Sequence, residues 1–83
     1  MSMREEIYVI LNEIFRDNFD DDSIVLSDET SSSDIEDWDS LEQINLVAAI
    51  QNKFKVRFSV DEVNSMKNVG EMVDLILKKT GDL

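Results

Sequence analysis

The chain has 83 residues, of which 42% are hydrophobic, and a formal net charge of −11. This length allows one modest hydrophobic core, and we expect residues 1–83 to form a single domain. The negative charge argues against binding to nucleic acid or an anionic membrane, and it favours protein partners with basic surfaces. The chain contains no histidine and no cysteine. It therefore lacks the commonest general base, the best nucleophile and most transition-metal ligands, so we predict no catalytic or metal-binding residue and no enzyme.

No run of apolar residues approaches the roughly 18 that a membrane span requires, and the N-terminus lacks the apolar region of a secretory signal. The absence of cysteine fits a reducing compartment. We therefore expect a soluble, monomeric, cytoplasmic protein.

The charges are unevenly distributed along the chain. Between Asp17 and Asn52 there are eleven carboxylates and no lysine or arginine, and all eight basic residues lie in residues 1–16 or after Asn52. Such a segment is either a solvated acidic loop or a docking face for a basic partner, and the distribution alone leaves both interpretations open.

A first helix is predicted from about Met3 to Asp17. Ser2 and Glu5 form a capping-box pattern at its start. Apolar residues then recur at helical spacing and predict a stripe that faces the core. These residues are Ile7, Ile10, Leu11, Ile14 and Phe15.

The segment from Phe19 to Trp38 has no strong hydrophobic period and is predicted to be a long connection. The acidic run from Asp17 to Asp22 has some features of a calcium loop, but no register supplies the required oxygen ligands, glycine and glutamate together. We therefore predict no calcium site. Five apolar residues of the connection are candidates for contact with the core: Ile24, Val25, Leu26, Ile35 and Trp38.

A second helix is predicted from Leu41 to about Phe54. Either Asp39 or Ser40 fits as its N-cap, because Glu42 and Gln43 respectively complete a capping box. Apolar residues occupy more than one stripe, so we expect this helix to be the most enclosed. A hydroxyl at a helix N-terminus is also suited to carry a phosphate, because free backbone N–H groups and the helix dipole favour an anion there. Ser40 is therefore either a cap alone or a site of modification.

Two more helices are predicted after residue 58. Ser59 and Glu62 form a capping box for a short helix that ends near Met66. Asn68 and Glu71 begin a last helix with a clear apolar stripe. The stripe consists of Val69, Met72, Val73, Ile76 and Leu77, with Lys78, Lys79 and Gly81 suited to its C-terminal end.

These elements predict an all-α fold: a small four-helix bundle of three long helices and one short helix, with a long loop between the first and second. The order of elements and the triplet that opens the second helix resemble those of the acyl carrier proteins over nearly the whole chain. The residues that carry the resemblance are Asp39-Ser40-Leu41, then Leu46, Ile50 and Phe54 at four-residue steps, then Phe58, and finally Asn68-Val69.

The resemblance implies that Ser40 carries 4′-phosphopantetheine, donated by coenzyme A through a phosphopantetheinyl transferase. The thiol of this arm would hold acyl or polyketide intermediates as thioesters and present them to acyl-loading and acyl-processing enzymes of fatty acid or polyketide biosynthesis. A chain without cysteine would thus obtain its thiol from the cofactor.

The resemblance also implies a docking surface for these enzymes, or a path for the arm. We expect it to include Asp37, Asp39, Leu41, Glu42, Ile44, Ala48 and Phe58. For Ile44, Ala48 and Phe58, a position in the core is the alternative.

Three positions depart from the family pattern. Trp38 stands where glycine is common, and it either shields the root of the arm or packs on the core. Asn68 replaces a threonine and caps equally well. The third departure is the set of uncharged residues Asn45, Gln51 and Asn52 where the family often has acidic residues. We therefore expect recognition to depend on the acidic residues near the start of the second helix, which are Asp34, Glu36, Asp37, Asp39 and Glu42. The departures at Trp38 and along the second helix favour a carrier dedicated to one specialised route.

Two other functions fit parts of the pattern. An acidic helical adaptor would bind a basic protein without any prosthetic group, and it would need the acidic segment but not the Ser40 hydroxyl. An aminoacyl or peptidyl carrier would need that hydroxyl, but Asp39 and the strong acidity argue against it.

Overall fold

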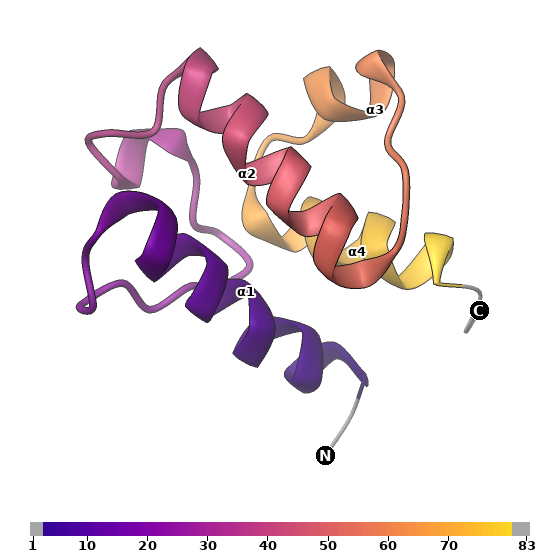
Figure 1. Cartoon of the computed structure of the whole chain (residues 1–83), viewed down its shortest axis with the longest axis horizontal. Helices are drawn as coiled ribbons and strands as arrows, with labels where there is room; N and C mark the ends of the chain where they lie inside the picture. Colours follow the sequence, from indigo (N-terminus) through magenta and orange to yellow (C-terminus); the bar gives the residue numbers. More distant parts are fainter. Residues whose placement is uncertain (1–2, 81–83) are drawn as a thin grey trace.

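The computed structural model describes residues 3–80 of the chain (Figure 1). In this part all regular structure is helical, with three long helices and one short one, as predicted. The helices are α1 (Met3–Phe19), α2 (Ser40–Phe54), α3 (Val60–Ser65) and α4 (Val69–Lys79), and a short 3-10 helix, η1 (Ser32–Asp34), interrupts the long connection. α1 packs against both α2 and α4, while α2 lies between α1 and α3 in the view of Figure 1.

The core forms where apolar stripes of the three long helices meet. Residues at i, i+3 and i+4 share one face of a helix, so the stripe read from the sequence of α1 becomes its buried face. The connection between α1 and α2 adds Ile24 and Leu26. The helical members of the core are Ile7, Leu11 and Phe15 of α1, Leu46 and Ile50 of α2, and Val69, Met72, Val73 and Ile76 of α4.

The helix starts follow the capping patterns of the sequence. The Ser59 hydroxyl accepts from the Glu62 N–H at 3.1 Å, and the Glu62 carboxylate accepts from the Ser59 N–H at 2.8 Å. The Asn68 side chain accepts from the Glu71 N–H at 2.9 Å. Each cap gives an acceptor to a backbone N–H that has none inside the helix. The predicted cap at Ser2 and the C-terminal role of Gly81 lie outside the described residues.

Three expectations about the elements need correction. α1 continues to Phe19, two residues beyond the predicted end. Val25 is 77% exposed, because it alternates with the buried Ile24 and Leu26 and so points away from the core. α4 rather than α2 is the most enclosed helix, since it buries five of its eleven residues while α2 buries three of fifteen. On the second apolar stripe of α2, Ile44 and Ala48 are exposed to solvent, although Val47 is buried.

Polar contacts hold the long connection against the helices. The Arg16 side chain donates through Nε to the Ile24 carbonyl at 2.8 Å, and Asn12 Oδ1 accepts from the Leu26 N–H at 2.9 Å. Both contacts satisfy backbone groups beside the two buried apolar residues of the connection. The connection is therefore fixed along α1.

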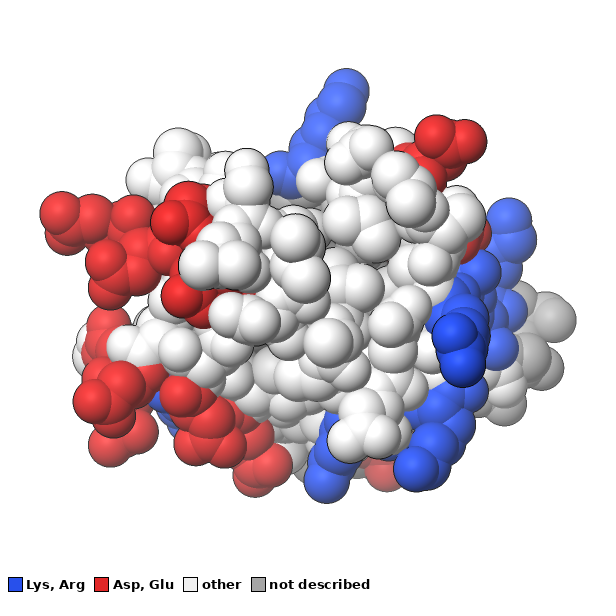
Figure 2. All heavy atoms as spheres, turned by 45° about the horizontal axis from the view of Figure 1, so that its top comes forward, with Lys and Arg blue, Asp and Glu red and all other residues white. Residues whose placement is uncertain are grey.

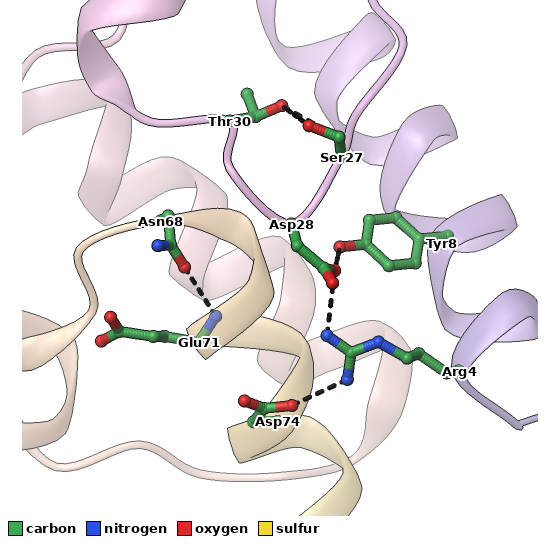
Figure 3. A network of polar contacts seen from close by, with 8 residues as sticks. All are labelled: Arg4, Tyr8, Ser27, Asp28, Thr30, Asn68, Glu71 and Asp74. Carbon is green, nitrogen blue, oxygen red and sulfur yellow. Dashed lines mark hydrogen bonds and ion pairs between the residues drawn. The ribbon is translucent and has the colours of Figure 1, made fainter.

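A polar cluster joins the connection to α1 and α4 (Figure 3). Arg4 of α1 donates to Asp28 Oδ1 of the connection at 2.9 Å and to Asp74 Oδ1 of α4 at 2.7 Å. The Tyr8 hydroxyl also donates to Asp28. Three segments that are distant in sequence thus share one set of hydrogen bonds.

The backbone of the connection also closes the N-terminus of α4. The Thr30 carbonyl accepts from the Val69 N–H at 2.8 Å, and the Asp28 carbonyl accepts from the Gly70 N–H at 3.0 Å. A Cβ atom on Gly70 would lie 2.9 Å from the Asp28 carbonyl oxygen, so only glycine allows this approach without a shift. With the Asn68 cap, the first-turn N–H groups of Val69, Gly70 and Glu71 all have acceptors.

Candidate functional site

Ser40 is the first residue of α2, and Asp39 before it is the N-cap. Asp39 Oδ1 accepts from the Glu42 N–H at 2.9 Å, so the structure selects Asp39 rather than Ser40 as the cap. The Ser40 side chain is exposed, and its hydroxyl has no hydrogen-bond partner among residues 3–80. Within the same residues, the N–H groups of Ser40 and Leu41 have no acceptor. The start of α2 is therefore open, in contrast to the closed start of α4.

Trp38 fixes the approach to this helix start. Its ring meets Phe15 of α1 edge-on, with centroids 5.2 Å apart and an interplanar angle of 82°. Its Nε1–H donates to Gln43 Oε1 of α2 at 2.6 Å. Half-buried, it packs against the core and also lines a groove beside Ser40. Both roles considered for Trp38 from the sequence thus fit its position.

This groove is open and has a volume of about 490 Å³. It runs between the start of α2 and the segment that joins α3 to α4. Its apolar part comes from Ile44, Val63, Met66 and Met72. Its polar lining consists of Ser32, Asp39, Ser40, Gln43, Asn64, Lys67 and Asn68, and Trp38 completes it.

The contribution of α3 and the segment after it was not among the predicted site residues. Val63, Asn64, Met66 and Lys67 line the groove because α3 passes near the start of α2. The spacing of Val63 and Met66 indicates one apolar face of a short helix. No local signal tells which helix that face approaches.

The predicted docking residues on α2 share an exposed surface. Leu41 and Ile44 are each 65% exposed, and Ala48, one turn further on, is exposed as well. A position in the core is therefore wrong for Ile44 and Ala48. Of these three, Ile44 also lines the groove next to Ser40.

The remaining predicted residues lie in different settings. Asp37 and Asp39 are exposed. Glu42 is half-buried and accepts from Asn18 Nδ2 of α1 at 2.9 Å, so this carboxylate also joins α1 to α2. Phe58 is half-buried, packs against the core and has Lys79 Nζ 5.9 Å from its ring centroid. The structure thus brings Asp39 and Ile44 to the groove and leaves Phe58 apart from its lining.

Figure 2 shows how charge is distributed on one face of the molecule. Carboxylates gather at one side, lysines and arginines gather at the opposite side, and an uncharged band separates them. Along α2, the residues Asn45, Gln51 and Asn52 contribute no charge, and only Glu42 and Lys53 are charged. The acidic residues just before α2, Asp34, Glu36 and Asp37, are all exposed.

The Ser40 hydroxyl is not activated by a neighbouring side chain among residues 3–80. No base lies within hydrogen-bond distance of Ser40 Oγ in the described part of the chain. Across residues 3–80, no three acidic side chains converge in a way that could hold a metal ion. Over the same range, no helix has the length and apolarity needed to cross a membrane.

Comparison with known proteins identifies the family. The family model described as "Phosphopantetheine attachment site" matches residues 10–76. The acyl carrier protein of Acidothermus cellulolyticus is 38% identical over 77 residues, which cover 93% of this chain and 92% of that protein. The acyl carrier protein of a Picosynechococcus species is 33% identical over 79 residues, covering 95% of this chain and 98% of its relative.

A solved structure extends the comparison to the fold. The solution structure of holo acyl carrier protein from Geobacter metallireducens superposes with a TM-score of 0.85 at 45% identity, covering 90% of this chain and 86% of that one. The helix order, the exposed serine at the start of α2 and the sequence similarity over nearly the full length agree with one another. The chain therefore belongs to the acyl carrier proteins, in the phosphopantetheine attachment family.

Proposed function

We propose that residues 1–83 form one carrier domain and that Ser40 carries 4′-phosphopantetheine. The observation that supports this most directly is the position of Ser40, exposed at the start of α2 with a hydroxyl that no residue between 3 and 80 hydrogen-bonds. A transferase can reach such a hydroxyl without unfolding any part of the bundle.

The residues around Ser40 fit the phosphodiester of this group. The N–H groups of Ser40 and Leu41 have no acceptor among residues 3–80, and such groups, with the dipole of α2, favour an anion at this helix start. Asp39 opposes that anion by its charge, but its carboxylate is held as the cap. The bound group supplies a thiol for thioester chemistry, which the chain itself lacks because it has no cysteine.

In this proposal the protein is a carrier and not a catalyst. Its partners are a phosphopantetheinyl transferase and acyl-loading and acyl-processing enzymes with basic docking surfaces. The exposed apolar residues Leu41, Ile44 and Ala48 form the centre of the docking face, with Asp37 and Asp39 at its acidic edge. Glu42 and Phe58 support this face from half-buried positions. We also assign the protein to the cytoplasm, where coenzyme A supplies the arm. We expect it to be a monomer.

The test is the intact mass of the protein before and after incubation with coenzyme A, Mg²⁺ and a broad-specificity transferase. Wild type is expected to gain the mass of one phosphopantetheine, and Ser40→Ala is expected to gain nothing. Ser32→Ala is the matched control, because Ser32 is an exposed serine that lines the same groove. A gain on Ser40→Ala, or none on folded wild type while a known carrier in the same reaction is loaded, would contradict the proposal.

A further inference from the structure

Lys67 is the single basic residue among those that line the groove beside Ser40 in the described chain. None of the other lysines and arginines of residues 3–80 lines this groove. The start of α2 is strongly acidic, with Asp37, Asp39 and Glu42 around Ser40. Lys67 is therefore a positive charge in a groove whose other charged neighbours are carboxylates.

The surroundings of Lys67 leave its ammonium group unpaired. The ion pairs of residues 3–80 involve Arg4 and Lys79, and none involves Lys67. The nearest carboxylate contact is made by its backbone, since the Lys67 N–H donates to Glu71 Oε1 at 3.4 Å. The following residue, Asn68, is fixed as the cap of α4. The backbone of Lys67 is thus held in place, while the residue is exposed and lines the groove.

We propose that Lys67 is the counter-charge for the phosphodiester on Ser40 and that it positions the root of the arm along the groove. This inference rests on the proposed attachment at Ser40. A phosphodiester keeps one negative charge at neutral pH, and Asp39 cannot move away from it because its carboxylate caps α2. Lys67 offsets that repulsion from the opposite wall of the groove. With the phosphate held between Lys67 and the start of α2, the arm leaves Ser40 over the apolar surface of Ile44, Met66 and Met72.

The size of the effect follows from exposure. Lys67 is exposed, so the attraction is that of a surface ion pair and is screened by salt. Surface pairs contribute little stability, and in a domain of this size such a contribution corresponds to a change in Tm on the order of 3 °C. It is measurable because the same protein can be compared with and without the arm.

The experiment compares Tm for the apo and holo forms of wild type, Lys67→Gln, Lys67→Arg and Lys78→Gln at low salt. The arm is attached with coenzyme A, Mg²⁺ and a broad-specificity transferase, and mass confirms it. Lys78→Gln is the matched control, because Lys78 is an exposed lysine that does not line the groove. The ³¹P resonance of the phosphodiester in each holo protein is the second readout.

We expect the difference in Tm between holo and apo forms to be about 3 °C higher in wild type and Lys78→Gln than in Lys67→Gln. Lys67→Arg should keep the wild-type value, and about 1 M NaCl should remove the difference. The ³¹P resonance should move in Lys67→Gln only. If Lys67→Gln matches Lys78→Gln in both readouts, Lys67 is not the counter-charge, although the attachment at Ser40 stands. If wild type gains no arm mass, both proposals fail.

Discussion

The pKa values of Tyr8 and Asp28 are shifted in opposite directions by the hydrogen bond between them. Burial, followed by the hydrogen bond to the Asp28 carboxylate, raises the pKa of Tyr8 from 10.0 to about 12. The same bond from Tyr8, and then the one from Arg4, lower the pKa of Asp28 below its ordinary value of 3.8. The pair therefore keeps both groups in the forms that hydrogen-bond, protonated tyrosine and ionised aspartate, across the neutral range.

Because Tyr8 is the only tyrosine of the chain, its titration can be followed by absorbance alone. We expect a midpoint near 12 in wild type and a lower one in Asp28→Asn. A raised pKa in the folded state means that this contact stabilises the fold below pH 10 and that the stabilisation is lost as pH rises through about 12. Asp22→Asn, an exposed carboxylate elsewhere in the connection, is the control. A wild-type midpoint near 10.0 would show that the contact is not formed in solution.

Leu46 and Ile44 differ in burial although they lie two residues apart on α2. Leu46 is fully buried and Ile44 is 65% exposed. We expect Leu46→Ala to lower the free energy of unfolding by about 2–5 kcal/mol and Ile44→Ala by roughly 0.5 kcal/mol or less. Urea unfolding of both variants, in the apo form, measures this. Equal losses would mean that Ile44 is a core residue after all.

At the scale of the elements, the sequence predicts those features that depend on neighbouring residues of the same helix. The caps at Ser59 and Asn68 depend on residues within one turn, and the structure confirms both. The stripe of α1 is confirmed at Ile7, Leu11 and Phe15, whereas Ile10 is only half-buried and lies outside the core cluster. The prediction that α2 is the most enclosed helix is wrong, because the sequence does not distinguish a buried apolar residue from an exposed one such as Leu41. The groove beside Ser40 could not be predicted from the sequence either, because it too depends on how the helices pack. It depends on where α3 lies, which no spacing within α3 encodes.

Gly70 illustrates an element-scale constraint that helix propensity alone would miss. Replacing glycine inside a helix by alanine normally stabilises it by about 1 kcal/mol. Here the new Cβ would meet the Asp28 carbonyl at 2.9 Å, a backbone atom that itself bonds the Gly70 N–H. We expect Gly70→Ala to lower the urea midpoint of unfolding.

The control is an alanine substitution at an exposed helical position that makes no such contact. Asp74 is unsuitable for this purpose, because its carboxylate accepts a hydrogen bond from Arg4. Glu13→Ala, on the exposed side of α1, serves instead. A Gly70→Ala variant as stable as wild type would indicate that the connection moves away from α4 at little cost.

At the scale of the whole molecule, the uneven distribution of charge gives the protein an electric dipole. On the face shown in Figure 2, most carboxylates lie toward one side and most basic residues toward the other. A partner with a basic surface is therefore drawn to the acidic side before any contact forms, which acts mainly on the association rate. Leu41 and Ile44, each 65% exposed on α2, are available for apolar contact once the partner has docked.

We expect the double variant Glu36→Gln with Asp37→Asn to slow attachment of the arm at low salt and to have little effect at high salt. The measurement is the initial rate of mass gain with a transferase whose docking surface is basic. Glu6→Gln with Glu13→Gln, two exposed carboxylates of α1, removes the same charge elsewhere and should slow the reaction less. Equal slowing by both double variants would assign the effect to net charge rather than to the acidic residues near Ser40.

The connection that closes the start of α4 has a consequence for amide hydrogen exchange. The Val69 and Gly70 N–H groups donate to carbonyls of residues about forty positions earlier, so they exchange only when the connection leaves α4. The equivalent amides of α2, those of Ser40 and Leu41, have no acceptor in the described chain and should exchange at nearly the rate of an unstructured peptide. Deuterium uptake at Val69 and Gly70 would therefore report opening of the α1–α2 connection, and uptake at Ser40 and Leu41 gives the unprotected reference rate. If deuterium uptake at Ser40 and Leu41 is slow only in the holo form, the phosphate accepts hydrogen bonds from these two amides.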